Sequence, residues 1–169
     1  DAIVAFWGAP QEDTAHIEHS LEAVLGCIAA LEAFNMECDA QALPRLETCF
    51  GLGAGPVVVG NVGSQARLSY TALGDTVNLV SRLEGLNRFY GTQAIDMERV
   101  VLEAGERYLF RRLDEDRVKG RQESVVIYEL LGRRGQVSAA TLAFRERYEE
   151  ALERYRRRDF RAALETLEA

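Results

Sequence analysis

Two polar side chains lie one helical turn apart in a segment that is predicted to be a helix. Gly74 and Asp75 are typical of a helix start, Gly91 is typical of a helix end, and the apolar positions between them recur every three or four residues. Asn78 and Arg82 are four residues apart, which places them within about 40° of each other on one helix face. An amide beside a guanidinium can orient a ribose and stabilise phosphate charge, although an ordinary solvated face carries the same residue types.

The chain contains a single lysine, Lys119, among its 20 basic residues. It stands between Val118 and Gly120, at the turn between two predicted strands. A compact ammonium can hold a mobile triphosphate as a point charge, and arginine there is not a neutral replacement. A surface lysine in a β-hairpin is the alternative interpretation.

Five glycines fall between residues 51 and 63. Neither GxxxxGK[ST] nor GxGxxG followed by a helix is present, so these glycines are not a Walker loop or a dinucleotide fingerprint. Because the first three precede a run of valines, we expect them to let a strand bend and a neighbouring backbone approach closely.

The histidines and cysteines do not form a metal-binding pattern. Cys27, Cys38 and Cys49 are an odd number, are widely spaced and lack a CxxC pair, so we interpret them as reduced cytosolic thiols. His16 and His19 lie near a predicted helix start without other ligand types around them, and we expect them to be solvated or to cap that helix.

Helical and strand-like segments intermix in the first 132 residues, which predicts an α+β fold. Residues 2–7 form an apolar, β-prone run. Helices are predicted over 15–34, 75–90 and 98–104, and strands over 46–55, 57–59, 68–73, 93–95, 108–113 and 124–131.

The composition changes after residue 138. Residues 144–168 contain seven arginines and six glutamates around apolar positions at helical spacing, with a break at 158–159. We expect a helical pair over 139–169 that packs on the preceding part. The start of a tetratricopeptide-like (TPR-like) unit, or an oligomerisation helix, is the alternative.

The charge balance and hydropathy exclude several classes of protein. Asp and Glu outnumber Lys and Arg by 27 to 20, giving a net charge of −7, which argues against general nucleic-acid or anionic-membrane binding. The 169 residues are 47% apolar and 28% charged, as in a globular domain with a sizeable core. No run approaches the roughly 20 apolar residues of a membrane-spanning helix, and no signal segment opens the sequence. We therefore expect a soluble, cytoplasmic chain, at the cytoplasmic face of a membrane if the full-length protein is anchored.

Four segments, in order, resemble the catalytic domain of the class III adenylate and guanylate cyclases. Residues 51–63 resemble the family's glycine-rich hairpin, and 70–78 with 82–84 resemble its signature. Residues 118–120 and 125–130 resemble its closing strands, and 1–8 the stretch after its Gly-Asp metal motif. The resemblance implies a ferredoxin-like βαββαβ cyclase fold over 1–132, with the N-terminal strand and helices absent from this chain, and a helical extension over 139–169.

The resemblance also implies roles for individual residues. Asp1 is expected to be the second of two metal-binding aspartates, because carboxylates are the ligands that Mg²⁺ or Mn²⁺ prefers beside nucleotide phosphates. Asn78 is expected to orient the ribose, and Arg82 to stabilise the pentavalent phosphorus while the 3′-hydroxyl attacks the α-phosphate. Lys119 is expected to bind the β and γ phosphates of the leaving pyrophosphate.

Thr71 bears on the choice of base. In the family, adenylate cyclases carry Asp or Thr at this position and guanylate cyclases usually carry Cys. A threonine hydroxyl can accept a hydrogen bond from the adenine N6 amino group, so ATP is predicted over GTP. The lysine that would contact adenine N1 falls three residues before the metal aspartate in the family, which is upstream of Asp1.

The implied reaction converts ATP to 3′,5′-cyclic AMP and pyrophosphate with two metal ions. In the family the aspartates come from one protomer and the Asn, Arg and Thr from the other, so a homodimer with two equivalent sites is expected. The family's first metal aspartate would lie before residue 1, so a polypeptide of only these residues is expected to turn over little or nothing.

Three alternatives stay open at the level of the sequence. The nearest is a guanylate cyclase. The second is a catalytically silent nucleotide-binding regulatory module of the same fold. The third is an interaction protein whose working surface is formed by the helices after residue 138.

Overall fold

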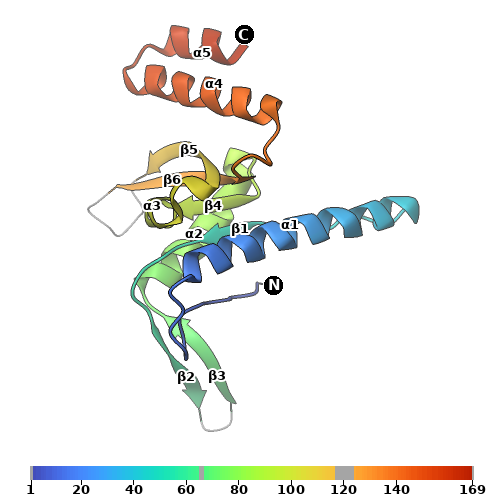
Figure 1. Cartoon of the computed structure of the whole chain (residues 1–169), viewed down its shortest axis with the longest axis vertical. Helices are drawn as coiled ribbons and strands as arrows, with labels where there is room; N and C mark the ends of the chain where they lie inside the picture. The colour runs from blue at the N-terminus through green and yellow to red at the C-terminus, as the bar shows by residue number, and fades with distance from the viewer. Residues whose placement is uncertain (1, 65–66, 117–123, 169) are drawn as a thin grey trace. The chain divides into compact units, whose positions relative to one another are not determined.

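The computed structural model describes residues 2–64, 67–116 and 124–168. The chain folds as two compact units, residues 1–94 and 95–169, whose elements are labelled in Figure 1. Within the described ranges, no helix is both long enough and apolar enough to cross a membrane.

The first unit combines two helices with a β-hairpin and a short strand. Leu21 of the first helix and Leu83 of the second are fully buried in its core. Its elements are α1 (His16–Ala40), β1 (Phe50–Leu52), β2 (Val58–Ser64), β3 (Arg67–Leu73) and α2 (Asp75–Tyr90).

The start of α1 is fixed by Asp13. Its carboxylate accepts a hydrogen bond from the Ala15 N–H at 2.9 Å, and its Oδ2 lies 2.7 Å from Nδ1 of His19. The His19 interaction lowers the pKa of the Asp13 carboxyl. Nδ1 of His16 lies 2.9 Å from the Asp13 carbonyl oxygen. The expectation that these histidines are solvated or cap the helix is met in part, because His19 is exposed, whereas no side chain caps the first turn of α1 and both histidines contact Asp13 instead.

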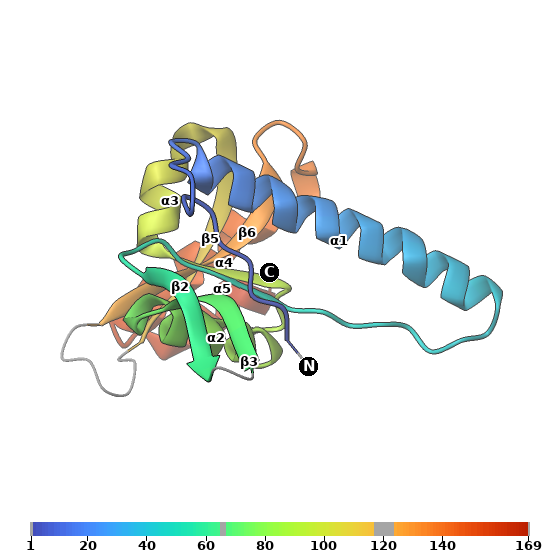
Figure 2. The ribbon, with the colours of Figure 1, turned by 90° about the horizontal axis from the view of Figure 1, so that it is seen from below.

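The chain after α1 runs back alongside the helix toward β1 (Figure 2). The buried Asn35 of α1 fixes this return, because its amide donates to the Leu46 carbonyl at 2.9 Å and accepts from the Leu46 N–H at 2.8 Å. These bonds occupy the backbone of Leu46 that a strand would use. The predicted strand over 46–55 is therefore wrong at its start, and β1 covers only Phe50–Leu52.

The hairpin of the first unit pairs β2 and β3 antiparallel, from Val58 opposite Leu73 to Ser64 opposite Arg67. Residues 2–7, in contrast, belong to no helix or strand. The β-prone composition of this run does not by itself make a strand, because a strand also requires a ladder partner.

The second unit contains an antiparallel sheet in the order β4–β6–β5, with β5 at its edge. Ile95 and Ile127 are fully buried in it. The elements are β4 (Ala94–Met97), α3 (Glu98–Ala104), the 3₁₀ turn η1 (Gly105–Arg107), β5 (Tyr108–Asp116) and β6 (Val125–Arg133).

Two helices, α4 (Ala139–Arg156) and α5 (Phe160–Glu168), follow the sheet. The Ser138 hydroxyl caps α4 by accepting from the Thr141 N–H at 3.1 Å. Buried Ala151 and Ala163 let the two helices pack closely. The predicted helical pair over 139–169 is confirmed.

The helix predicted over 15–34 is too short at its C-terminal end, since α1 continues past Phe34 to Ala40.

Candidate functional site

Helix α2 presents Asn78 and Arg82 on its exposed face. It begins after Gly74, whose φ of 152° suits glycine, and Asp75 lies in its first turn, where a carboxylate complements the helix dipole. Leu79 and Leu83, each one residue after a polar member of the pair, are buried. The buried leucines therefore fix the rotation of α2 that turns Asn78 and Arg82 outward.

The far end of α2 is fixed by the buried Asn87. Its amide donates to the carbonyl oxygens of Phe50 and Glu84, at 2.9 Å each, and its Oδ1 accepts from the Thr92 hydroxyl at 2.9 Å. Gly91 ends the helix in the left-handed conformation, at φ 66°. These bonds hold α2 against β1. They thereby also fix how far along the helix axis Asn78 and Arg82 lie relative to β1.

Gly51 of β1 lies directly beneath α2. A Cβ atom at this position would collide with the backbone of the helix, at the Val80 carbonyl oxygen and the Glu84 nitrogen. Only glycine allows the strand and helix backbones to approach this closely. The expectation that this glycine admits a neighbouring backbone is confirmed.

The start of α2 contacts the same glycine-rich segment. The Thr76 hydroxyl donates to the Pro56 carbonyl at 3.4 Å, and a Cβ at Gly55 would meet the Thr76 side chain. The segment before β2 thus holds both the middle and the first turn of the helix.

Thr71 lies on β3 opposite Gly60 of β2 and is partly exposed. Ala72, the next residue, is buried, as the alternation of a strand requires. The strand leads through Gly74 directly into α2. The structure therefore places Thr71 on the element that precedes the helix of Asn78 and Arg82. Asp1 and Lys119 lie outside the described residues.

A cavity of about 590 Å³ lies in the first unit. Phe6 and Trp7, Asp13 and His16 at the start of α1, and the Gly51–Gly55 segment line it together with Thr76, Val77 and Val80 of α2. Asn78 and Arg82 are not part of this lining. The sequence analysis did not assign Phe6 and Trp7 to a cavity. The apolar run over residues 2–7 was the sequence feature that could have indicated it.

The sequence of residues 1–132 matches the family model of the adenylate and guanylate cyclase catalytic domain. The chain belongs to this cyclase family. Adenylate cyclase 1 from Rhizobium meliloti (strain 1021) is 45% identical over 132 residues, which cover 78% of this chain and 20% of that protein. This cyclase domain thus spans about a fifth of the length of that relative.

Two solved cyclase structures share the fold of the domain. The adenylyl cyclase CyaB from P. aeruginosa matches with a TM-score of 0.65 and 25% identity, over 82% of this chain and 74% of that one. The guanylyl cyclase Cya2 matches with a TM-score of 0.65 and 28% identity, over 78% and 66%. The predicted α+β cyclase fold is confirmed.

Cyclases of this family use divalent metal ions. Within residues 2–64, 67–116 and 124–168, the cyclase domain has no group of three His, Cys, Asp or Glu side chains that could hold one. The described residues alone therefore do not make a metal centre. Cys27, Cys38 and Cys49 form no disulfide with one another in the structure.

Proposed function

We propose that this domain acts in an adenylate cyclase, which converts ATP to 3′,5′-cyclic AMP and pyrophosphate. The observation that carries the proposal is the exposed pair Asn78 and Arg82 on α2, with Leu79 and Leu83 buried behind it. The 45% identity to an adenylate cyclase supports the same reaction.

In the proposed reaction, the 3′-hydroxyl of the ribose loses its proton to solvent and its oxygen forms a bond to the α-phosphorus, while the bond from that phosphorus to the bridging oxygen of pyrophosphate breaks. The side chain of Asn78 orients the ribose. The guanidinium of Arg82 donates hydrogen bonds to the phosphate oxygens, where negative charge grows in the transition state. Lys119 binds the β and γ phosphates, and two Mg²⁺ or Mn²⁺ ions, with Asp1 as one ligand, are the proposed cofactors.

Thr71 supports ATP as the substrate. Its hydroxyl lies on a strand, partly exposed, where it can accept a hydrogen bond from an adenine N6 amino group. The second candidate is GTP cyclisation, because the guanylyl cyclase Cya2 matches this fold with the same TM-score, 0.65, as the adenylyl cyclase CyaB. Product analysis with each nucleotide separates the two.

We further propose that the active enzyme is a homodimer with sites at the interface. Asn78 and Arg82 are exposed and lie outside the lining of the cavity in their own unit. This supports a site that a second chain completes. The proposed catalytic domain covers residues 1–132, and residues 139–169 form the helical extension, for which the start of a TPR-like unit is the alternative interpretation.

The decisive experiment replaces Arg82 in the full-length protein. Arg82→Ala is expected to lower kcat about 100-fold or more, with a smaller change in nucleotide affinity, because the guanidinium acts mainly in the transition state. Arg88→Ala is the matched control, since Arg88 is exposed on the same helix but lies about 120° from Arg82 around the helix axis. A normal kcat in Arg82→Ala would contradict the proposal.

A further inference from the structure

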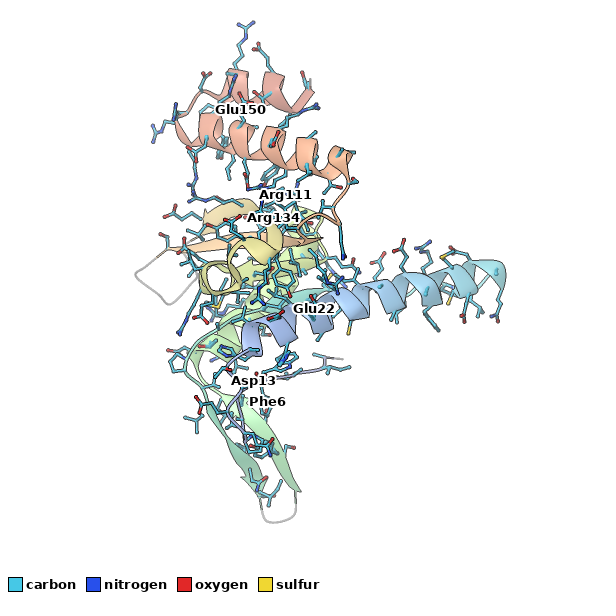
Figure 3. The ribbon with its side chains drawn as sticks, viewed as in Figure 1. Phe6, Asp13, Glu22, Arg111, Arg134 and Glu150 are labelled. Atoms are coloured by element: carbon cyan, nitrogen blue, oxygen red, sulfur yellow. The ribbon has the colours of Figure 1, made fainter. Side chains whose placement is uncertain are left out.

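Helix α5 packs on α4 with its small side chains. Ala163 is buried, and Ala162 and Thr166 are partly buried. The Thr166 hydroxyl donates to the Ala162 carbonyl at 2.7 Å, so this polar group is satisfied within the helix. In Figure 3 the longer side chains of α5 project on the side away from α4. The packing on α4 therefore leaves the large apolar side chains of α5 outside the contact.

Three of these side chains, Phe160, Leu164 and Leu167, form what we call the α5 stripe. They are spaced four and three residues apart, which places them on one face of the helix, and they are 57%, 57% and 48% exposed. The exposed ring of Tyr155, at the end of α4, lies 5.4 Å from that of Phe160, centre to centre, and extends the stripe. A contiguous apolar stripe in water is unfavourable and is typical of a surface that another protein segment covers.

The helix that carries α5 is fixed to the sheet of the second unit. The Tyr148 hydroxyl of α4 donates to the Leu113 carbonyl of β5 at 3.2 Å. The buried Arg111 has its Cζ 4.4 Å from the centre of the Tyr148 ring and its Nη2 2.7 Å from Glu129 Oε2 of β6. Figure 3 shows Arg111 between the sheet and α4. Because α4 is held in this way, the α5 stripe is accessible to another chain without rearrangement of the unit.

The charged side chains beside the stripe are separated by sign along the helix. Arg157, Arg158 and Arg161 lie at the N-terminal end of α5, Glu165 and Glu168 lie towards its C-terminal end, and all five are exposed. Arg161 Nε lies 3.0 Å from Glu165 Oε1 of its own helix, but the two side chains are 91% and 63% exposed and accessible to a further charge. Arg161 and Glu168 are seven residues apart, so they lie on the same flank of the stripe.

An antiparallel pairing of two copies of α5 matches this pattern. A two-fold axis near Leu164 places Phe160 of one chain beside Leu167 of the other, because these residues lie on either side of Leu164 at nearly equal distances. The same axis places Arg161 of each chain beside Glu168 of the other. A parallel pairing would instead bring like charges together. The surface is therefore self-complementary, as a two-fold contact requires.

We propose that the α5 stripe is an interaction surface for a second copy of this chain, paired antiparallel around Leu164. Burial of the apolar side chains supplies the affinity, and the pairs between Arg161 and Glu168 set the orientation. The proposal does not rest on the cyclase reaction, because Asn78 and Arg82 lie in the first unit and α5 in the second. It gives the helical extension a role of its own, as a contact between chains.

The test places single cysteines on the stripe of the full-length protein, in a background where the exposed Cys27 is replaced by serine. Under mild oxidation, Leu164→Cys is expected to form a disulfide-linked dimer. Phe160→Cys alone is expected to form none, because antiparallel pairing separates its two copies by about 10 Å along the axis and a disulfide needs Cα atoms within about 7 Å. An equal mixture of Phe160→Cys and Leu167→Cys chains is expected to cross-link. Leu102→Cys, at an exposed leucine of α3, is the matched control and is expected to stay unlinked.

Charge exchange tests the orientation of the two helices. In the Leu164→Cys chain, Arg161→Glu and Glu168→Arg are each expected to slow cross-linking about two- to tenfold, because each turns both ion pairs of the contact into like-charge contacts. Mixing the two variant chains is expected to restore the rate, since each glutamate then meets an arginine. The double exchange Arg161→Glu with Glu168→Arg in one chain is expected to restore it as well.

Absence of a cross-link in Leu164→Cys overturns the proposal, and it is the result expected if another segment or a different protein covers the stripe. Cross-linking of Leu102→Cys at the same rate as Leu164→Cys overturns it as well, because it would show random collision. Phe160→Cys chains that link to each other, or a mixture of the charge variants that stays slow, contradict the antiparallel pairing. All of the substituted side chains are exposed, so the variants are expected to fold.

Discussion

The buried carboxyl of Asp96 is expected to make the stability of the second unit depend on pH. Asp96 lies in β4, is fully buried, and neither of its carboxylate oxygens has a hydrogen-bond partner among the described residues. Burial raises the pKa of Asp96 well above its usual range, and the carboxylate of Glu129 adds to this effect. At a pH between the pKa of Asp96 in the unfolded chain and its raised pKa in the folded protein, the folded protein therefore holds a proton on Asp96 that the unfolded chain has released.

The direction of the effect follows from this difference in proton binding. Below the pKa of Asp96 in the unfolded chain, near 3.8, both states are protonated and pH has no effect through this residue. Above it, the folded state binds more protons than the unfolded state. The free energy of unfolding then decreases by about 1.4 kcal/mol per pH unit, until the pH reaches the raised pKa of the folded state.

Asp96→Asn removes the titrating group and keeps the shape of the side chain. Urea unfolding at pH 5, 6 and 7, followed by circular dichroism, is expected to show that the variant gains stability over the wild type as the pH rises, by at most about 1.4 kcal/mol per pH unit. In the difference between the free energies of unfolding of the two proteins, the contributions of the other titrating groups to the pH dependence cancel. These groups include Glu129, whose pKa is also raised by burial. Asp39→Asn, at an exposed aspartate, is the control. Parallel stability curves for Asp96→Asn and the wild type would refute the reasoning, because they would mean that Asp96 is ionised in the folded state.

Three further predictions concern the candidate site. Gly51→Ala is expected to destabilise the protein by about 2–4 kcal/mol in urea unfolding, because the new methyl group meets the backbone of α2; Gly26→Ala, with open space around the added methyl, is expected to leave stability unchanged or higher. Mixing Arg82→Ala with Asp1→Ala protomers of the full-length protein is expected to restore turnover through one intact site per heterodimer, and failure to recover activity would contradict the shared interface. Thr71→Cys is expected to raise the ratio of GTP to ATP turnover, and an unchanged ratio would show that Thr71 does not read the base.

Structural features that depend only on neighbouring residues along the chain, such as helix ends and helix faces, could be predicted from the sequence. The helical period, Gly74 and Gly91 define α2 closely, and the same period places Asn78 and Arg82 on one face. The role of Gly51 could also be anticipated, because a glycine before a valine run is typical of a strand that another backbone approaches. These features are local, since each depends on residues within a few turns or a single strand.

Other features depend on which distant segments meet, and only the tertiary structure decided them. Residues 2–7 have a β-prone composition but no strand, and Asn35 binds Leu46 where a strand was predicted. The burial of Asp96 and the contact of α4 with Leu113 of β5 left no periodic signal. The physical reason is that hydrogen-bond partners and burial come from packing between segments, whereas periodicity records only which face of an element is apolar.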